Sequence, residues 1–477
     1  MSNLEALKLA LLNKQKTLAE IYNGQGSLSL FNYVNAWPAA VPLPPSSPVL
    51  AYVREALESY YPPAVAAAAA GQFAAAPLVS TVDHHGLLNH PFFINSNLIF
   101  SLRQNQPYLI CLATGGVSLN NSSWPGSLVF TGPGGGLRRL SFFSDRQKTG
   151  TVLAQPPLKL EQFDQFRRRL REEGLLSQAQ KERLLTLLTD VFGDKEVGAA
   201  ADFLGQSARA SRLLWKNFFP TAPEVLYLPL EQLIGRLAAD IAGEPGHPLY
   251  PLLFSAAGLG LIGGTFAGSL GAFSSGHKGS FLFWGLAPTG RRIHLRYNAG
   301  CLEGDGFSLK AEPGAVAAAL RQGRLYPTTL VCFLILLYYG VTCAGGFNQV
   351  NWLTDIKQKF LRLFAKAGLK DAAAAIGPIE TKNFLEGSLG FFPGLAGQDF
   401  SLATGLDLYL AGQDFYHAYL QLAKQLALKD SIDCQLPEIY RVITPAEERQ
   451  PELLAVTAAD IFERAGLRKK VDSLNFA

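Results

Sequence analysis

The chain has 477 residues, of which 48% are hydrophobic and 17% charged, and its formal net charge is +4. This composition argues against disorder over most of the length, and the length predicts two or three domains. The basic residues are scattered, which argues against the concentrated basic face of a dedicated nucleic-acid binder.

Five widely spread cysteines without Cys-x-x-Cys spacing are typical of a reducing compartment. The first residues lack the layout of a signal peptide, so we expect a cytoplasmic protein. Two stretches without charged residues, 248–276 and 325–350, reach the ~20 residues that a membrane helix needs. Because polar residues, glycines and Pro327 interrupt them, we expect both in the core and membrane spanning to be less favoured.

The first predicted region, 1–155, begins with helices and continues into a small sheet. An amphipathic pattern predicts the first helix, and short apolar runs bounded by glycine and asparagine predict the strands. We expect helices at 4–21, 49–60 and 64–76, and strands at 108–113, 127–131 and 137–143.

A charged helical hairpin at 158–192 begins the second predicted region, 156–245, an insert or linker that ends in a helix at 230–241. The hairpin carries Arg167, Arg168 and Arg169, for which we favour a solvated helix face over binding of an anionic partner.

The third predicted region, 246–477, is a second α+β half that contains a glycine-rich segment and then a β-hairpin. We expect the strands of the hairpin at 280–285 and 291–297, and helices at 315–320, 330–339, 356–367, 414–427 and 458–465. The chain is therefore expected to be a mixed α+β protein, with a small sheet in each half surrounded by helices.

Three of the seven histidines, His84, His85 and His90, fall within seven positions beside Asp83. If residues 80–85 are extended, Asp83 and His85 share one face and His84 lies on the other. Two histidines and a carboxylate are a standard ligand set for Zn, Mn or Fe, and we favour one such divalent metal here. Metal-free acid–base work, with an aspartate orienting a histidine, and a polar turn whose histidines cap backbone groups stay open.

The tripeptide Asp83-His84-His85 resembles the signature of the DHH-family phosphoesterases, in which it follows a strand and contributes to a manganese site. That family also needs aspartates and a histidine upstream, and residues 1–82 contain neither residue type. The resemblance therefore ends at the tripeptide, and we assign no family from it.

The segment Gly258 to Gly263 fits the dinucleotide-binding pattern G-x-G-x-x-G. An acidic residue about 20 positions further on would bind the ribose, but none lies between Glu244 and Glu303. We therefore do not expect a nucleotide cofactor, and we favour a helix whose small residues pack closely on a neighbour.

Alternation over residues 292–296 places Arg292, His294 and Arg296 on one strand face. The two guanidinium groups disfavour protonation of the imidazole and suit a carboxylate or phosphate substrate. A solvated cationic face is equally consistent with the pattern. His277 and Lys278, which lie between glycines, would add a mobile cationic loop over the same sheet.

A double glycine precedes Phe347, Asn348 and Gln349, whose amides can orient a substrate, although a plain turn fits equally well. Together the patterns predict an enzyme of hydrolase or lyase type that acts on a small anionic metabolite. The His/Asp cluster would act as acid and base, with or without metal, and the arginines would bind the substrate. The alternative is a noncatalytic binding or scaffold protein, with membrane association left open.

We expect no nucleic-acid partner and leave a homo-oligomer open. The expected catalytic residues are Asp83, His85 and His294; the expected metal ligands are Asp83, His84, His85 and His90; the expected substrate-binding residues are Asn89, His277, Lys278, Arg292, Arg296, Asn348 and Gln349.

Overall fold

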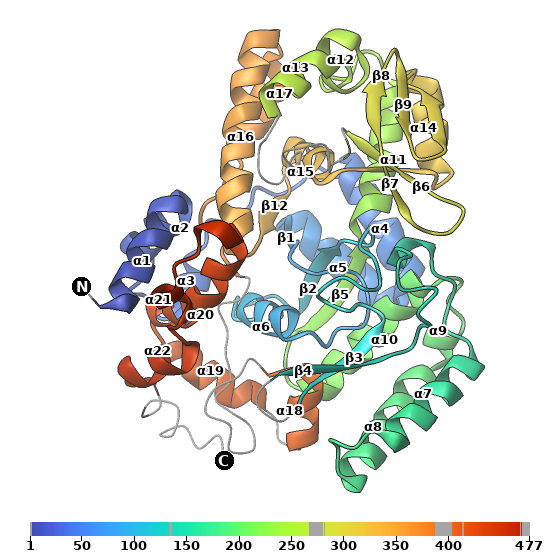
Figure 1. Cartoon of the computed structure of the whole chain (residues 1–477). Coiled ribbons are helices and arrows are strands. Elements are labelled where there is room, and N and C mark those ends of the chain that lie inside the picture. The colour runs from blue at the N-terminus through green and yellow to red at the C-terminus, as the bar shows by residue number, and fades with distance from the viewer. Residues whose placement is uncertain are drawn as a thin grey trace.

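A computed structural model describes residues 2–132, 136–266, 280, 282–386, 403–412, 415–467 and 469. Helices outnumber strands along the described chain, and several small sheets lie among the helices (Figure 1), which confirms the α+β prediction. No helix among the described residues has both the length and the apolar character needed to cross a membrane.

The central sheet has four parallel strands in the order β12–β1–β2–β5. These strands are β1 (Leu78–Ser80), β2 (Tyr108–Ala113), β5 (Glu224–Pro229) and β12 (Thr342–Ala344). All are buried or nearly so, as expected for parallel strands covered on both faces. The sheet takes strands from all three predicted regions, so these regions share one hydrophobic core.

Five helices precede the sheet: α1 (Asn3–Lys14), α2 (Lys16–Gln25), α3 (Leu30–Asn35), α4 (Pro48–Tyr60) and α5 (Pro63–Ala75). The single helix expected at 4–21 is wrong, because the backbone leaves helical geometry at Gln15, with φ −114° and ψ 74°. The expectations for α4 and α5 are confirmed.

Elements of the middle of the chain connect and flank the central strands. They are α6 (Pro91–Phe100), β3 (Ser127–Thr131), β4 (Leu137–Ser141), a short 3₁₀ helix η2 (Val152–Ala154), α7 (Leu160–Glu172), α8 (Gln178–Phe192), α9 (Lys195–Gly198), α10 (Phe203–Phe218) and α11 (Leu230–Gly243). Strands β3 and β4 form a separate antiparallel pair, and the hairpin of α7 and α8 lies at the periphery of the molecule (Figure 1).

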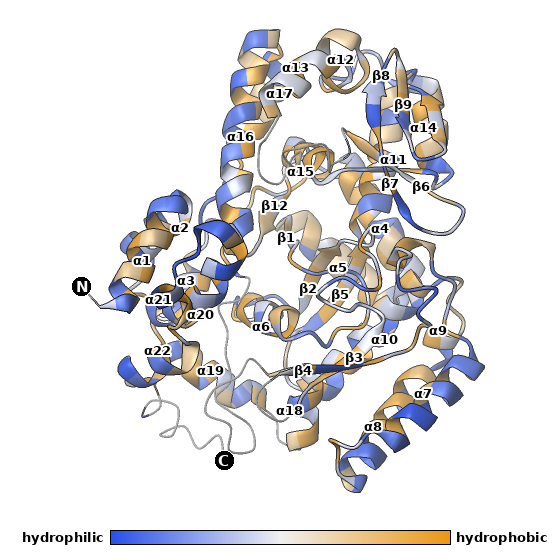
Figure 2. Ribbon diagram, in the orientation of Figure 1, coloured by the Kyte–Doolittle hydropathy of each residue, from blue (hydrophilic) through white to orange (hydrophobic). Residues whose placement is uncertain are grey.

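The described part of the next segment contains two small antiparallel sheets, β11–β6–β7 and β10–β9–β8. Its elements are α12 (Tyr250–Phe254), α13 (Ala256–Phe266), β6 (Phe283–Leu286), β7 (Arg292–His294), β8 (Arg296–Asn298), β9 (Cys301–Gly304), β10 (Phe307–Lys310), α14 (Pro313–Arg321), β11 (Leu325–Pro327) and α15 (Thr329–Tyr338). Helix α15 is hydrophobic along its length (Figure 2) and buried, so the stretch expected at 325–350 does lie in the core.

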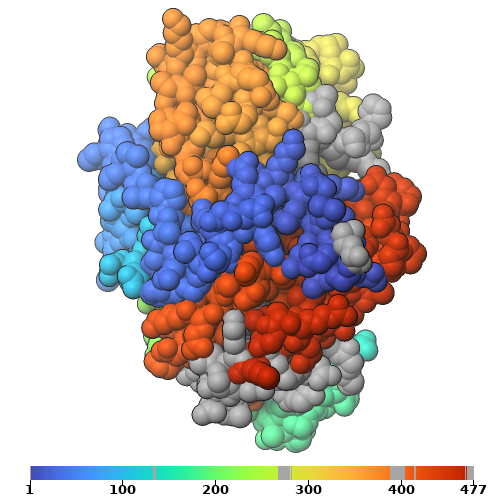
Figure 3. Space-filling view, turned by 90° about the vertical axis from the view of Figure 1, so that its left-hand side faces the viewer, coloured from blue at the N-terminus to red at the C-terminus, as the bar shows by residue number. Residues whose placement is uncertain are grey.

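The last part of the described chain is helical. It comprises α16 (Phe347–Ala367), α17 (Lys370–Ile376), α18 (Gly405–Ala411), α19 (Phe415–Gln425), α20 (Leu428–Ile443), a 3₁₀ helix η3 (Ala446–Glu448), α21 (Pro451–Leu454) and α22 (Ala458–Arg464). Figure 3 shows the N-terminal helices between α16 and the C-terminal helices, consistent with the packing of α1 on α20 and of α2 on α16.

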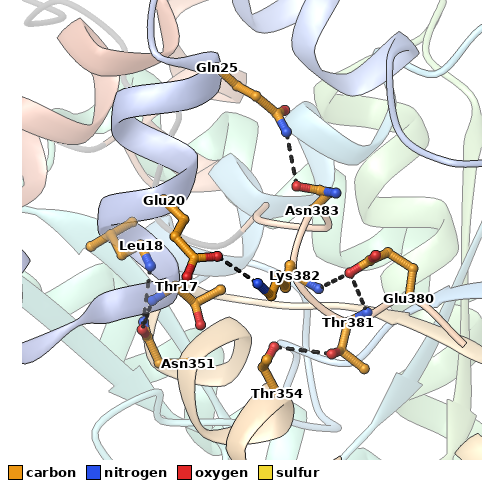
Figure 4. Close-up of polar contacts among 10 residues, drawn as sticks. All are labelled: Thr17, Leu18, Glu20, Gln25, Asn351, Thr354, Glu380, Thr381, Lys382 and Asn383. Atoms are coloured by element: carbon orange, nitrogen blue, oxygen red, sulfur yellow. Dashed lines mark hydrogen bonds and ion pairs between the residues drawn. The ribbon is translucent and has the colours of Figure 1, made fainter. Parts of the chain in front are cut away.

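Polar contacts fasten α2 to α16 and to the segment 380–383 (Figure 4). The Asn351 side chain accepts from the backbone N–H groups of Thr17 and Leu18 at 2.9 and 3.3 Å, which caps the start of α2. Gln25 donates to Asn383 at 2.9 Å, and Lys382 pairs with Glu20 at 2.7 Å. These contacts position the segment 380–383, which leads directly to residues 384–386. There Leu385 forms a β-bridge with Gly345, next to β12 at the edge of the central sheet.

Candidate functional site at the carboxyl ends of the parallel strands

The order of the central strands reverses beside β1. The chain passes from β1 through α6 to β2 on one side, whereas β12, from late in the sequence, pairs with the other side of β1. In open parallel sheets, ligands bind outside the carboxyl ends of the strands at such a reversal. The segment with Asp83 and His85 follows β1 at this end, and the double glycine Gly345-Gly346 follows β12.

Residues 81–85 continue from β1 in an extended form. His85 N–H donates to Thr114 O at 2.8 Å, and Thr114 N–H donates to Asp83 O at 2.9 Å, so the segment runs beside the end of β2. The run ends at Gly86, whose φ of 155° side chains rarely adopt, and a Cβ there would lie 2.5 Å from Pro125 Cβ. Glycine is therefore required at the turn that follows the histidines.

Asp83 is fully buried among donors from two other elements. Tyr227 on β5 donates its hydroxyl to Asp83 Oδ1 at 2.7 Å, and Asn97 Nδ2 on α6 donates to the same oxygen at 3.1 Å. Burial raises the pKa of Asp83 to about 7, while the hydrogen bonds from Tyr227 and Asn97 act in the lowering direction. Asp83 therefore changes charge near neutral pH.

A second buried carboxyl group, Glu386, lies at the same end of the sheet. Its backbone N–H donates to Gly345 O at 2.9 Å, and Ser80 at the end of β1 donates its hydroxyl to Glu386 Oε1. Burial raises the pKa of Glu386 well above its usual value, and the charge of Asp83 raises it further. Among the described residues, Glu386 Oε2 has no hydrogen-bond partner. We call Asp83 and Glu386 the carboxyl pair.

Cys111 on β2 also belongs to this buried group. Its thiol donates to Asn97 Oδ1 at 3.2 Å, so Asn97 contacts both Cys111 and Asp83. Burial, followed by the charges of Asp83 and Glu386, raises the pKa of the Cys111 thiol well above its usual value. The thiol therefore stays protonated, which excludes an activated thiolate nucleophile in this arrangement.

His85 lies on the same side of the segment as Asp83, as the alternation predicts. Its ring packs edge-on against Tyr227, with centroids 5.8 Å apart, and its Nδ1 lies 3.3 Å from Ser207 Oγ. Because the Ser207 hydroxyl donates to Leu204 O at 3.2 Å, its oxygen accepts the proton on Nδ1 and the lone pair stays on Nε2. Burial lowers the pKa of His85 to about 3, so the imidazole is neutral.

His84 and His90 lie on the other side, where they flank Phe93. His84 Nδ1 is 2.7 Å from Ser123 Oγ, and His90 Nδ1 accepts from the N–H of Phe92 at 3.3 Å as the N-cap of α6. Burial lowers the pKa of both imidazoles to about 4. These contacts fit the interpretation of a polar turn that caps backbone groups.

The four residues expected to ligate a metal are thus divided between two sides of the segment. Across the described residues, no group of three or more His, Cys, Asp or Glu side chains is placed to hold a metal ion. Asn89, expected to bind substrate, instead joins two elements: it donates to Val129 O at 2.6 Å and accepts from the N–H of Leu406 at 2.9 Å.

The side-chain amides of Asn348 and Gln349, which follow the double glycine, lie in different surroundings. Gln349 on α16 is buried and donates to Thr81 Oγ1 at 2.6 Å, which places it at the carboxyl end of β1. The buried Oδ1 of Asn348 has no partner among the described residues.

The cationic strand predicted at 291–297 is wrong as a single strand. Arg292 and His294 lie on β7, which pairs with β6, whereas Arg296 lies on β8 in another sheet, opposite Glu303. All three side chains are exposed, and the Arg292 guanidinium stacks 4.9 Å from the ring centroid of Trp284. Burial and then Arg292 lower the pKa of His294, in the expected direction. His277 and Lys278 lie outside the described residues.

Another buried acid, Glu231 on the first turn of α11, contacts the loop that follows β2. Its carboxylate accepts from the N–H groups of Gly115 and Gly116 at 2.9 Å each, directly after β2. A Cβ on Gly116 would lie 2.6 Å from the ring of Trp284, the indole on which Arg292 stacks. Burial raises the pKa of Glu231, while the two N–H groups and the charge of Arg292 act in the lowering direction. Arg292 therefore lies beside the loop that follows β2.

Several members of the site were not predicted. Ser80, Tyr227, Glu231 and Glu386 carried no motif, although Tyr227 is the one polar side chain in the apolar run 225–228, which is a usable signal. Neither a known protein-family model nor a curated protein sequence matches this chain. The function must therefore be inferred from the geometry of the site.

Proposed function

We propose that this chain is an enzyme of hydrolase or lyase type that transfers protons at the carboxyl end of the parallel sheet. The observation that carries the proposal is the carboxyl pair: two fully buried acids at the strand reversal, whose pKa values are both raised by burial. Buried acids with perturbed pKa values that lie close together are typical of the groups that transfer protons in enzymes.

Asp83 is the proposed general base. Its pKa of about 7 keeps a substantial ionised fraction at neutral pH, together with a strong affinity for a proton. The hydroxyl of Tyr227 and the amide of Asn97 hold the carboxylate in one orientation, so it needs little reorganisation when it accepts a proton.

Glu386 is the proposed general acid. Burial raises the pKa of Glu386 well above its usual value and the charge of Asp83 raises it further, so both effects favour the protonated form. Ser80 occupies Oε1, so the acidic proton is directed to Oε2, the oxygen without a partner among the described residues. A substrate atom that accepts this proton would satisfy that oxygen. All of these groups are buried, so catalysis as proposed requires the site to open for substrate.

The substrate is proposed to be a small metabolite with a carboxylate or phosphate. Arg292 is the proposed anion-binding group, because its exposed guanidinium is anchored on Trp284 beside the loop that follows β2. Planar guanidinium groups bind both kinds of anion through paired hydrogen bonds. The metal-bound version of the hypothesis is less well supported than the metal-free one, because the histidines lie on opposite sides.

The test compares turnover by matched isosteric variants. The purified chain is incubated with a panel of phosphorylated and carboxylated metabolites, and products are followed by mass spectrometry. The variants are Asp83→Asn and Glu386→Gln, and the control is Asp433→Asn on α20. Asp433 is also a buried acid with a raised pKa, but it pairs with Lys8 at 2.7 Å among the terminal helices.

We expect wild type and Asp433→Asn to convert at least one metabolite of the panel. Both site variants should remain folded by circular dichroism and turn over about 10²–10⁴-fold more slowly, the usual contribution of a general acid or base. Full turnover by folded Asp83→Asn would refute its role as the base. Ligand binding by wild type without any turnover would instead favour a noncatalytic binding protein.

A further inference from the structure

A surface pocket of about 390 Å³ lies between α7 and the segment that follows β4. One wall is the face of α7 that carries Gln165, Arg168, Arg169 and Glu172, at helical spacings of three and four residues. The opposite wall is the segment 142–144. The volume falls within the ~300–1,000 Å³ typical of small-molecule sites.

Two phenylalanine rings of the segment 142–144 line this pocket. Phe142 stacks on Phe166 of α7, with ring centroids 4.1 Å apart and an interplanar angle of 9°. Phe142 and Phe143 are 2% and 1% exposed, so their rings offer almost no surface on which a base could stack. A ligand must therefore be recognised by the polar rim.

The rim carries two cations that are not neutralised by ion pairs among the described residues. Arg167 pairs with Asp164 at 3.3 Å, whereas neither Arg168 nor Arg169 has such a partner in the described part of the chain. Arg169 only donates Nε to the Gln165 backbone oxygen at 3.4 Å, which leaves its terminal nitrogens for a ligand. Arg168 and Arg169 are exposed, as expected for a solvated helix face, and both line the pocket, whereas Arg167 is half-buried and paired with Asp164.

We propose that this pocket binds a sugar phosphate, at a site separate from the carboxyl pair. The guanidinium groups of Arg168 and Arg169 match a phosphate group. The Gln165 amide adds a neutral donor at one end of the helix face. Glu172, one turn beyond Arg169, accepts hydrogen bonds from hydroxyl groups and repels a second anion. A ligand with one phosphate and several hydroxyls fits this order of groups along the helix.

The test is calorimetric titration of the full chain with glucose 6-phosphate, inorganic phosphate and glucose. The binding variant is Arg168→Gln with Arg169→Gln, and the matched control is Arg171→Gln, an exposed arginine of the same helix that does not line the pocket. Because the substituted residues are exposed, the variants should fold normally. A third variant, Glu172→Gln, tests recognition of the hydroxyl groups.

We expect glucose 6-phosphate to bind about tenfold or more tightly than inorganic phosphate, and glucose to bind weakly. The double variant should lose at least about tenfold in affinity, since hydrogen bonds to charged groups are worth that much, and Arg171→Gln should stay within about twofold. Glu172→Gln should reduce the preference for glucose 6-phosphate over inorganic phosphate. Unchanged affinity in the double variant would overturn the site. Equal affinity for inorganic phosphate, or for glucose, would overturn the sugar-phosphate assignment.

Discussion

Asp83 should make the stability of this chain depend on pH in a direction opposite to that of an ordinary surface acid. Its pKa is about 7 in the folded state against 3.8 for an unperturbed aspartate. The folded state therefore binds more protons than the unfolded state between these values, and stability falls as pH rises from about 4 to about 7. At about 1.36 kcal/mol for each pH unit, this difference is about 4 kcal/mol as an upper limit.

The assay is chemical denaturation of wild type and Asp83→Asn at pH 5, 6, 7 and 8. Asparagine keeps the shape of the side chain but does not titrate, so the stability advantage of wild type over the variant should shrink as pH rises. Asp145→Asn is the control, because Lys148 lowers the pKa of the exposed Asp145, which gives the opposite sign. A wild-type advantage that is constant or grows from pH 5 to 8 would refute a buried Asp83 with a raised pKa.

Three further predictions concern the same site. Tyr227→Phe removes a 2.7 Å hydrogen bond to Asp83 and should raise the pKa of Asp83 by about one to two pH units, measured as an upward move of the pH dependence described above. Elemental analysis of the chain, purified without a metal-binding tag, should find far less than one equivalent of Zn, Mn or Fe, because the predicted ligands lie on two sides of their segment. One stoichiometric equivalent of metal in wild type, lost in Asp83→Ala, would restore the metal hypothesis. Gly116→Ala places a Cβ 2.6 Å from Trp284 and should lower the free energy of unfolding by about 1–3 kcal/mol. Gly243→Ala, with open space around the new Cβ, should not lower it. Equal effects of the two substitutions in thermal denaturation would contradict this packing.

Local patterns predicted the parts of the site that depend on neighbours in sequence. The period of two along the extended segment 80–85 placed Asp83 and His85 together and His84 opposite, and the contacts follow that division. The run at 108–113 and the run at 127–131 became β2 and β3 with the expected bounds. Each of these features is decided by residues within one element.

Features that join distant residues could not be predicted in the same way. Glu386 meets Ser80 across 306 positions, and Tyr227 meets Asp83 across 144, because parallel strands pair only after long connections. The break between β7 and β8 was missed for a different reason. The alternation of polar and apolar side chains continues on both sides of Leu295, but the N–H of Leu295 donates to the Ser280 hydroxyl instead of to a neighbouring strand. Side-chain periodicity does not reveal that a strand changes sheets.

The incomplete hydrogen bonding around the carboxyl pair is consistent with the chemical role that we propose for it. Burying two acids costs free energy, and a network selected only for stability would be expected to satisfy every polar atom or to replace the acids with apolar side chains. Here Asp83 is well supplied with donors, yet Glu386 Oε2 and His85 Nε2 are buried without a partner among the described residues. Both atoms belong to residues at the carboxyl ends of the strands, where the strand order reverses. Buried atoms without a partner also occur elsewhere among the described residues, such as Gln15 Oε1 and Thr444 Oγ1. Glu386 Oε2 differs from these two because it belongs to a buried acid beside a second buried acid at the strand reversal, and this supports the proposal that its missing partner is a substrate.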